Sequence, residues 1–323
     1  MYEAFYGFHE KPFTLLPDPE FLYLGNKHST ALAMLQYGLE SQAGFTVVTG
    51  GIGCGKTTLI RRVLNELDRD LVVGLISNTH KAFGDLLEQV LSAFRIEYEW
   101  HRKAQLYKCF VDFLVENYAN NRRTVVIVDE AQNMETDMLE ELRLLSNVNA
   151  DKDQIIQLVL VGQPQLWEKL RQPELEQFAQ RISVDYFLEP LSMREGFSYI
   201  QHRLKVAGGS TMLFESAAIA KILDRARGVP RVINILCETA LVYGYAKQQK
   251  RITESIIDQV IEDKTKHGLF ATEAEPNASL APENEHPVAQ PEKTNRKPDN
   301  TIKLSRYAQE RTSVNRKKES EGE

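Results

Sequence analysis

The chain has 323 residues, of which 42% are hydrophobic, so it is long and apolar enough to fold into one large or two modest globular domains. Its net charge of −6 gives no overall support for nucleic-acid binding. The first residues lack the basic segment of a secretion signal, and no apolar run approaches the ~20 residues that span a bilayer, which predicts a cytoplasmic protein.

The first predicted elements enclose a glycine-rich loop. Residues 50–57 read Gly-Gly-Ile-Gly-Cys-Gly-Lys-Thr and fit the phosphate-loop pattern G-x-x-x-x-G-K-[ST], with an apolar strand predicted at 45–48 and an amphipathic helix at 58–67. Glycine lets the backbone turn its N–H groups inward, toward phosphate oxygens at the start of a helix. The predicted nucleotide-binding residues are Gly50, Gly51, Ile52, Gly53, Cys54, Gly55, Lys56, Thr57 and Thr58.

Two side chains of this loop carry the chemistry of phosphate binding. We expect Lys56 to neutralise the β- and γ-phosphates and Thr57 to ligate Mg²⁺, so ATP and Mg²⁺ are the predicted cofactors. Cys54 is open to two interpretations: a thiol sensitised by the helix N-terminus, or a small side chain that the loop tolerates. It lies far in sequence from Cys109 and Cys237, which argues against a zinc site and against a disulfide framework.

A second motif lies further along the chain. A strand is predicted at 71–76, helices at 83–94 and 105–118, and a β-branched strand at 124–128 that leads into Asp129 and Glu130. This is the ending of a Walker B strand. Asp129 is placed to hold Mg²⁺ through water beside Thr57, and Glu130 to polarise the water that attacks the γ-phosphate. Glu130 therefore predicts hydrolysis and argues against a switch with negligible turnover.

The remaining pattern completes an α/β domain and adds a helical one. A helix is predicted at 135–147, and buried strands at 155–161 and 182–188. Alternating strands and helices predict a parallel sheet with right-handed crossovers, here the five-stranded sheet of a P-loop NTPase with helices on both faces. After Pro190 only helices are predicted, at 193–206, 216–226, 231–248 and 253–263, which indicates a small all-helical lid domain.

These elements divide the chain into four parts. We expect an N-terminal arm with a first helix at 1–40, the nucleotide-binding α/β domain at 41–190, the helical lid at 191–267 and a polar tail at 268–323. The tail has too few clustered apolar residues to offset the entropy of ordering, so we expect it to be disordered.

The opening of the chain carries a family resemblance. Its residues are Phe5-Tyr6-Gly7-Phe8, then Lys11-Pro12-Phe13, Pro17-Asp18-Pro19 and Phe21-Leu22-Tyr23, with a helix at 28–41 that leads into the phosphate loop. With both Walker motifs in place, residues 2–266 resemble an AAA+ ATPase of the general secretion pathway protein A (ExeA) type. Within that group the chain is similar to the ATPases associated with pilus biogenesis and with exosortase systems.

The resemblance implies two further residues around the γ-phosphate. Gln163 matches the sensor 1 position, which contacts the γ-phosphate or the attacking water; the alternative is a helix-entry residue before Pro164. Arg231 follows Pro230 and resembles the sensor 2 arginine, which would couple the lid to the phosphates; the alternative is a structural salt bridge.

The resemblance also implies an arginine that acts between subunits. Arg181 resembles an arginine finger, which completes the site of a neighbouring subunit and so implies a homo-oligomer. Arg171 is the competing candidate, and an ordinary surface arginine is the third interpretation. For Phe8, Pro12 and Phe13 two alternatives stay open: wrapping the adenine, or packing of the N-terminal arm onto the sheet.

The function that the resemblance implies is ATP hydrolysis that drives or regulates assembly or export of an envelope structure: a secretion, pilus or exopolysaccharide system. Longer relatives continue into a membrane helix and a peptidoglycan-binding domain. For this chain, with its polar tail, we expect docking on a partner at the inner membrane instead. The alternative is a DNA-dependent regulatory AAA+ ATPase of the kind that selects transposition targets, against which the acidic net charge argues.

Overall fold

The computed structural model describes residues 1–66, 70–77, 79, 84–98, 102–150 and 153–267. The α-helices are α1 (Tyr2–Tyr6), α2 (Asn26–Glu40), α3 (Lys56–Glu66), α4 (Leu86–Ala93), α5 (Lys103–Ala119), α6 (Thr136–Leu145), α7 (Gln165–Leu170), α8 (Glu176–Ala179), α9 (Met193–Val206), α10 (Ser216–Ala226), α11 (Pro230–Ala246) and α12 (Glu254–His267). The strands are β1 (Phe45–Gly50), β2 (Leu71–Ile76), β3 (Arg123–Val128), β4 (Asn149–Ala150), β5 (Asp153–Gln154), β6 (Ile156–Gly162) and β7 (Ile182–Leu188), with short 3₁₀ helices η1 (Pro19–Phe21), η3 (Ala131–Asn133) and η4 (Pro173–Leu175). The described residues all belong to one compact unit, and the tail predicted at 268–323 lies outside the described residues.

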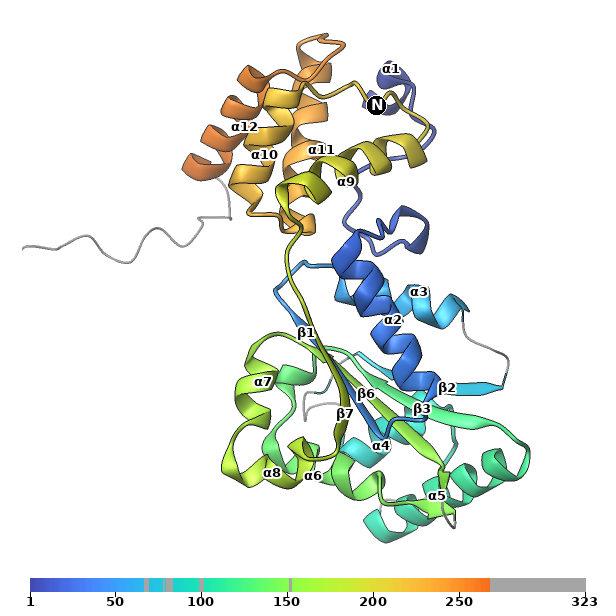
Figure 1. Cartoon of the computed structure of the whole chain (residues 1–323). Helices are drawn as coiled ribbons and strands as arrows, with labels where there is room; N and C mark the ends of the chain where they lie inside the picture. The colour runs from blue at the N-terminus through green and yellow to red at the C-terminus, as the bar shows by residue number, and fades with distance from the viewer. Residues whose placement is uncertain (67–69, 78, 80–83, 99–101, 151–152, 268–323) are drawn as a thin grey trace, which may run out of the picture. The chain divides into compact units, whose positions relative to one another are not determined.

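A parallel sheet forms the centre of the first domain (Figure 1). Its strand order is β2-β3-β6-β1-β7, which confirms the predicted five-stranded parallel sheet. Along β3, Val126 and Val128 pack into a cluster with helices α4 to α8. Val125 and Ile127 alternate with them and pack against α2 and α3 on the other face. Because helices cover both faces, the central strands β1 and β6 are buried at every position.

Helices α9 to α12 build a second apolar core, as the lid prediction requires. Ile200, Ile222 and Leu241 are fully buried in it, one from each of three helices. A single parallel β-bridge between Phe214 and Ile252 joins the loops that precede α10 and α12. The pattern did not predict this bridge, because one isolated pair leaves no periodic signal in a sequence.

The N-terminal arm packs on the lid, which corrects both interpretations offered for its aromatic residues. Phe8 and Phe13 are buried in the lid's apolar cluster, and the ring centroids of Phe13 and Phe214 lie 6.0 Å apart. Among the described residues, Phe8, Pro12 and Phe13 are absent from both clusters that cover the sheet and from the pocket described below. The physical reason is that the lid helices leave apolar surface for large rings to cover.

Several other elements differ from the predicted pattern. Strands β4 and β5 form a two-residue antiparallel pair directly before β6, too short to read from alternation. The helix predicted at 83–94 begins at Leu86. There the Asp85 N–H donates to the Glu88 carboxylate at 3.2 Å, an interaction typical of a helix start.

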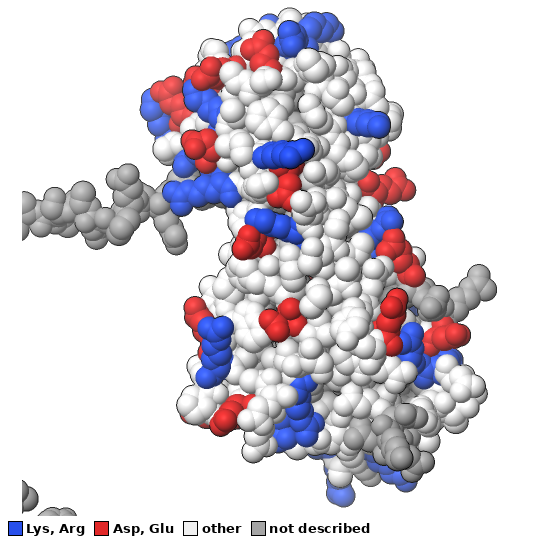
Figure 2. Space-filling model, in the orientation of Figure 1, with Lys and Arg blue, Asp and Glu red and all other residues white. Residues whose placement is uncertain are grey.

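The surface of the described residues carries mixed charge. Figure 2 shows basic and acidic side chains interspersed over the visible face, without a continuous basic stripe. Such a stripe is the electrostatic footprint of nucleic-acid binding. In the part of the chain that the structure describes, no helix is both long enough and apolar enough to traverse a bilayer.

Candidate nucleotide site

The glycine-rich loop joins the end of β1 to the start of α3, at the carboxyl edge of the sheet. Gly53 and Gly55 have φ values of +77° and +97°, in the region that favours glycine. A Cβ on Gly53 would lie 2.5 Å from the Cβ of Arg231, and one on Gly55 would lie 3.2 Å from Nε2 of His28. Both glycines are therefore required by backbone conformation and by the close approach of a neighbour.

Lys56 lies buried inside this loop. Its ammonium donates hydrogen bonds to the carbonyl oxygens of Gly50 and Gly51, at 2.9 and 3.0 Å. Burial lowers the pKa of Lys56, while the nearby carboxylates of Glu130 and Asp129 act in the opposite direction. An ammonium has three N–H donors, so two loop carbonyls leave one donor for a phosphate oxygen.

Thr57 and Asp129 meet at the same edge of the sheet. The Thr57 hydroxyl donates to Oδ2 of Asp129 at 2.8 Å, and Asp129 is 7% exposed. Hydroxyl and carboxylate oxygens are ligands that suit Mg²⁺, which keeps several waters and takes its other ligands from the substrate phosphates. The hydroxyl oxygen of Thr57 and the carboxylate oxygens of Asp129 therefore fit the Mg²⁺ ion that the sequence predicts.

Glu130 is held by two amide side chains. Its Oε2 accepts from Nε2 of Gln132 at 2.6 Å and from Nε2 of Gln163 at 3.2 Å. The Gln132 side chain closes the arrangement, because its Oε1 accepts from the Gln163 backbone N–H at 2.9 Å. Glu130 itself has φ +53°, a left-handed conformation that turns the chain directly after the Walker B strand. The structure thus brings Glu130 and Gln163 together and adds Gln132, which the sequence analysis missed although it lies only two residues after Glu130.

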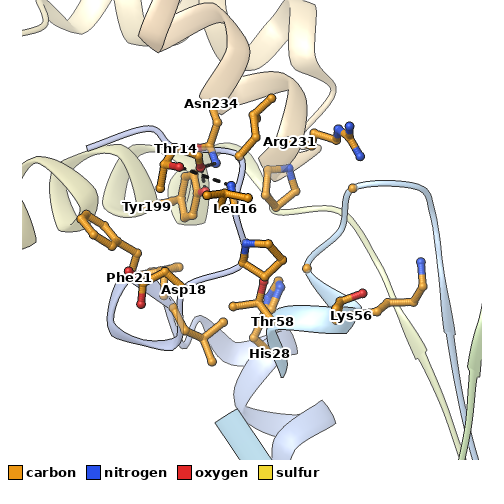
Figure 3. A pocket seen from close by; sticks show the side chains of 18 of the residues that line it. Thr14, Leu16, Asp18, Phe21, His28, Lys56, Thr58, Tyr199, Arg231 and Asn234 are labelled. Atoms are coloured by element: carbon orange, nitrogen blue, oxygen red, sulfur yellow. Dashed lines mark hydrogen bonds between the residues drawn. The ribbon is translucent and has the colours of Figure 1, made fainter. Parts of the chain in front are cut away.

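These groups border one pocket, shown in Figure 3. Its walls come from the phosphate loop, from residues 14–18 of the N-terminal arm, and from helices α9 and α11 of the lid. The predicted site residues that line it are Ile52, Gly53, Gly55, Lys56, Thr57, Thr58, Glu130, Gln163 and Arg231. Gly50, Gly51, Cys54 and Asp129 belong to the same loop and strand end but do not line the pocket.

Arg231 brings the lid into contact with the phosphate loop. Pro230 is the first residue of α11, and the backbone N–H of Arg231 donates to the carbonyl oxygen of Gly53 at 3.2 Å. The Arg231 side chain is exposed and lines the pocket. The lid helix therefore begins against the loop that is expected to bind phosphate.

A buried polar cluster on the lid forms another part of the pocket wall, and the sequence analysis missed it. The Tyr199 hydroxyl donates to Oδ1 of Asn234 at 2.7 Å and accepts from Nη1 of Arg203 at 3.0 Å. Arg203 is 6% exposed, and its guanidinium lies 4.7 Å from the Phe21 ring centroid. These side chains come from two helices and the arm, so no local motif marks them in the sequence.

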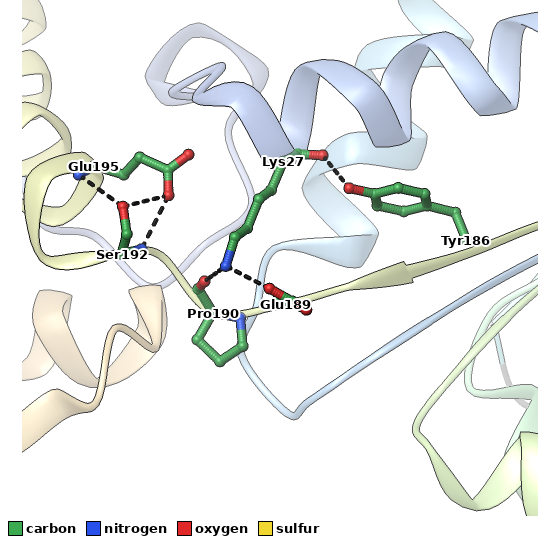
Figure 4. Close-up of polar contacts among 6 residues, drawn as sticks. All are labelled: Lys27, Tyr186, Glu189, Pro190, Ser192 and Glu195. Atoms are coloured by element: carbon green, nitrogen blue, oxygen red, sulfur yellow. Dashed lines mark hydrogen bonds and ion pairs between the residues drawn. The ribbon is translucent and has the colours of Figure 1, made fainter.

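The connection between sheet and lid is tied to the first turn of α2 (Figure 4). Lys27 donates to the Pro190 carbonyl at 3.0 Å and forms an ion pair with Glu189 at 2.6 Å. The Tyr186 hydroxyl on β7 donates to the Lys27 carbonyl at 3.1 Å. Just beyond, Ser192 caps α9. The chain therefore leaves the sheet through a segment with defined polar contacts.

The two candidate finger arginines lie away from this pocket. Arg181 precedes β7 at the amino edge of the sheet, since Ile182 pairs with Phe45 and not with the phosphate-loop end of β1. Its Nη1 donates to Oγ of Ser146 at 2.9 Å. Arg171 is exposed at the end of α7, with its guanidinium 5.8 Å from the Trp167 ring centroid. Neither arginine lines the pocket of its own chain.

Cys54 lies in surroundings that do not sensitise its thiol. It is 1% exposed, and burial raises its pKa. A thiolate is the reactive form of cysteine, so a raised pKa makes this thiol less reactive. The interpretation that fits is a small side chain accommodated by the loop. The backbone carbonyl of the same residue accepts a hydrogen bond from Nε2 of His28 at 3.0 Å.

The chain is similar to known proteins along most of its length. The AAA domain family matches residues 39–170, which contain both Walker motifs. General secretion pathway protein A of Aeromonas hydrophila is 39% identical over 258 residues, covering 80% of this chain and 47% of that protein. The chain therefore spans about half the length of the curated relative that it matches.

Solved structures show the same fold at low sequence identity. The ORC2 protein of Aeropyrum pernix, in its ADPNP–ADP complexes, superposes with a TM-score of 0.61 at 19% identity, covering 79% of this chain and 72% of that one. Cdc6p of Pyrobaculum aerophilum gives a TM-score of 0.60 at 15% identity, covering 76% and 70% of the two chains. Together with the sequence match, these findings identify the chain as a nucleotide-binding AAA protein of the general secretion pathway protein A type.

Proposed function

We propose that the chain binds ATP with Mg²⁺ and hydrolyses it, as one subunit of a homo-oligomer that drives or regulates the assembly or export of an envelope structure. The observation that supports the proposal is that three chemical groups lie at one pocket. They are the Lys56 ammonium, which can bind phosphate; the Thr57 hydroxyl, which with its partner Asp129 suits Mg²⁺; and the Glu130 carboxylate, which amide side chains hold in place.

Binding rests on the phosphate loop. Glycines in the left-handed region let a loop of this kind turn its backbone N–H groups toward phosphate, and Lys56 adds a positive charge with one donor beyond the two that bond Gly50 and Gly51. Mg²⁺, held through Thr57 and Asp129, would neutralise charge that develops on the β- and γ-phosphate oxygens. Arg231 would complete the γ-phosphate end from the lid.

Hydrolysis rests on Glu130. One of its carboxylate oxygens accepts from Gln132 and Gln163, which leaves the other oxygen free to accept a hydrogen bond from the attacking water. Gln163 then touches both the catalytic carboxylate and the pocket, as a sensor 1 residue would. We assign orientation of the water to Glu130 and stabilisation of the γ-phosphate to Lys56, Gln163 and Arg231.

The oligomer and the pathway are supported by different observations. Arg181 lies at the amino edge of the sheet, where its guanidinium donates to Ser146, and it does not line its own pocket. As an arginine finger it would act on the ATP of a neighbouring subunit. The envelope process is supported by the name of the relative, general secretion pathway protein A, over the half of that protein that this chain spans. We therefore propose a peripheral position at the inner membrane, through a partner protein.

The test measures ATP binding and phosphate release with the full chain and with two variants. Lys56→Ala should weaken ATP binding by about 100-fold because it removes the cation at the phosphates. Lys205→Ala, which changes an exposed lysine of α9, should leave both quantities unchanged. Duplex DNA should not alter phosphate release; stimulation by DNA would favour the DNA-dependent regulator, and an absence of ATP binding would contradict the proposal.

A further inference from the structure

His28 lies in the first turn of α2, and its side chain packs against the phosphate loop. It is 3% exposed, yet it is one of the residues that line the pocket (Figure 3). Its Nε2 lies 3.0 Å from the carbonyl oxygen of Cys54. The same nitrogen would lie 3.2 Å from a Cβ on Gly55, so the imidazole ring packs directly against the loop.

The hydrogen bond to Cys54 fixes the state of the ring. A carbonyl oxygen only accepts, so Nε2 carries the hydrogen and donates it. Burial lowers the pKa of His28, which keeps the imidazole neutral. In a neutral ring whose Nε2 is a donor, Nδ1 carries a lone pair and is an acceptor.

Nδ1 is the unexplained atom of this arrangement. It is buried, and no hydrogen-bond donor of the described residues reaches it. A buried acceptor without a partner is costly, and nearly all such groups in native proteins are paired. The ring lines the pocket while Nδ1 itself is covered, so the available partner is a ligand that enters the pocket and displaces the covering side chains.

The chemical groups of a nucleotide limit which part of it can donate a hydrogen bond to Nδ1. Fully ionised phosphate oxygens only accept hydrogen bonds, so they cannot serve Nδ1. The nucleoside part of ATP offers donors: the exocyclic amino group of adenine and the ribose hydroxyls. We propose that Nδ1 of His28 accepts a hydrogen bond from the nucleoside part of the bound nucleotide, which makes His28 a specificity-determining residue. The proposal rests on the proposed function, because it requires a nucleotide in this pocket.

Two substitutions separate the two nitrogens of the ring. In His28→Gln, the longer amide can place its N–H₂ where Nε2 stood, which keeps a donor for the Cys54 carbonyl but removes the acceptor at Nδ1. In His28→Asn, the shorter side chain can place an oxygen where Nδ1 stood, which keeps the acceptor and removes the bond to Cys54. His202→Gln is the matched control, because His202 also has a buried unpartnered nitrogen but does not line the pocket.

The experiment measures dissociation constants of the full-length wild type and each variant for ATP, purine riboside triphosphate, 2′-deoxy-ATP and 3′-deoxy-ATP. The first analogue lacks the amino group, and the other two each lack one hydroxyl. One of the three analogues lacks the group that donates to Nδ1. That analogue should bind about tenfold more weakly than ATP to the wild type, to His28→Asn and to His202→Gln. His28→Gln has no acceptor at this place, so it should bind ATP and that analogue equally well, and the analogue that gives this result identifies the donor group.

The outcomes distinguish this inference from the proposed function. Equal losses in His28→Gln and in the wild type for every analogue would overturn the role of Nδ1, even where ATP binds tightly. If the wild type bound no ATP at all, the proposed function itself would fail. Thermal melting of each variant without nucleotide shows whether it is folded. If His28→Gln is unfolded, His28→Ala takes its place, because it also lacks the acceptor at Nδ1 and should likewise bind ATP and the analogue equally well.

Discussion

Glu130 owes its orientation to amide groups contributed by two other segments of the chain. Gln132 follows it in the 3₁₀ helix η3, and Gln163 follows β6, the neighbouring strand. A carboxylate that must accept a proton from water benefits from a fixed direction, because proton transfer depends on geometry first. Gln132 is therefore a positioning residue: it touches Glu130 and the Gln163 backbone, but it does not line the pocket.

Gln132→Leu should lower kcat for ATP hydrolysis by roughly tenfold to 100-fold and leave the dissociation constant for ATP within about twofold, because it removes the amide that orients Glu130 and Gln163 and leaves the phosphate loop unchanged. Steady-state kinetics and equilibrium binding give the two quantities separately. Gln201→Leu, at an exposed glutamine of α9, is the control and should change neither. An unchanged kcat in Gln132→Leu would remove Gln132 from the arrangement.

His28 predicts a dependence of stability on pH. Its pKa in the folded state lies below the ordinary value of 6.5 because the ring is buried. As pH falls below about 6.5, the unfolded chain takes up a proton that the folded chain does not, so acid favours unfolding. Thermal melting between pH 8 and pH 5 should show that His28→Gln loses less stability than the wild type on acidification. Equal losses would show that His28 does not remain neutral.

At the scale of elements, the N-terminal arm tests how the lid is held together. Phe13 is 1% exposed and packs edge-on against Phe214 inside the lid. Phe13→Ala should reduce the free energy of unfolding by about 3–5 kcal/mol, the usual cost of removing a buried ring. Urea unfolding measures this, with Leu16→Ala, an exposed arm residue, as a control that should cost less than about 0.5 kcal/mol. A cost below about 1 kcal/mol for Phe13→Ala would mean that the arm does not belong to the lid core.

The elements that the sequence predicted well are those with strong periodic or motif signals. β7, α9 and α10 have the predicted bounds, because each combines an apolar pattern with a clear start or end. The phosphate loop and Walker B strand were equally readable, since their chemistry requires particular residues at fixed spacing. The arm on the lid, the Arg203 cluster and Nδ1 of His28 were not readable, because tertiary contacts between distant segments define them.

At the scale of the whole molecule, the pocket joins the sheet domain to the lid. The Arg231 backbone N–H donates a hydrogen bond to the phosphate loop. Lys27 of α2 donates a hydrogen bond and forms an ion pair with the segment between β7 and α9. A change at the γ-phosphate can therefore reach the lid through residues that touch both parts. The proposed oligomer extends this coupling to a second subunit through Arg181.

Mixing two inactive variants tests action between subunits. Arg181→Ala should still bind ATP through its own phosphate loop but hydrolyse it slowly, because the neighbouring subunit no longer supplies the finger arginine. Glu130→Gln should also bind ATP and hydrolyse it slowly, because it lacks the carboxylate that activates the water. In mixed oligomers some interfaces pair an intact Glu130 with an intact Arg181, so part of the activity should return. Phosphate release is measured against the mixing ratio, with assembly checked by sedimentation. If activity stays on the line between the two inactive endpoints while subunits exchange, Arg181 does not act in trans.

The central claim is that Glu130 turns nucleotide binding into hydrolysis, and a single-turnover measurement on Glu130→Gln tests it most directly. The substitution removes the carboxylate that accepts the proton from water and leaves Lys56, Thr57 and Asp129 unchanged. Glu130→Gln should bind ATP within about threefold of the wild-type affinity and cleave it at least about 100-fold more slowly. Cleavage of bound ATP at the wild-type rate would show that Glu130 does not activate the attacking water.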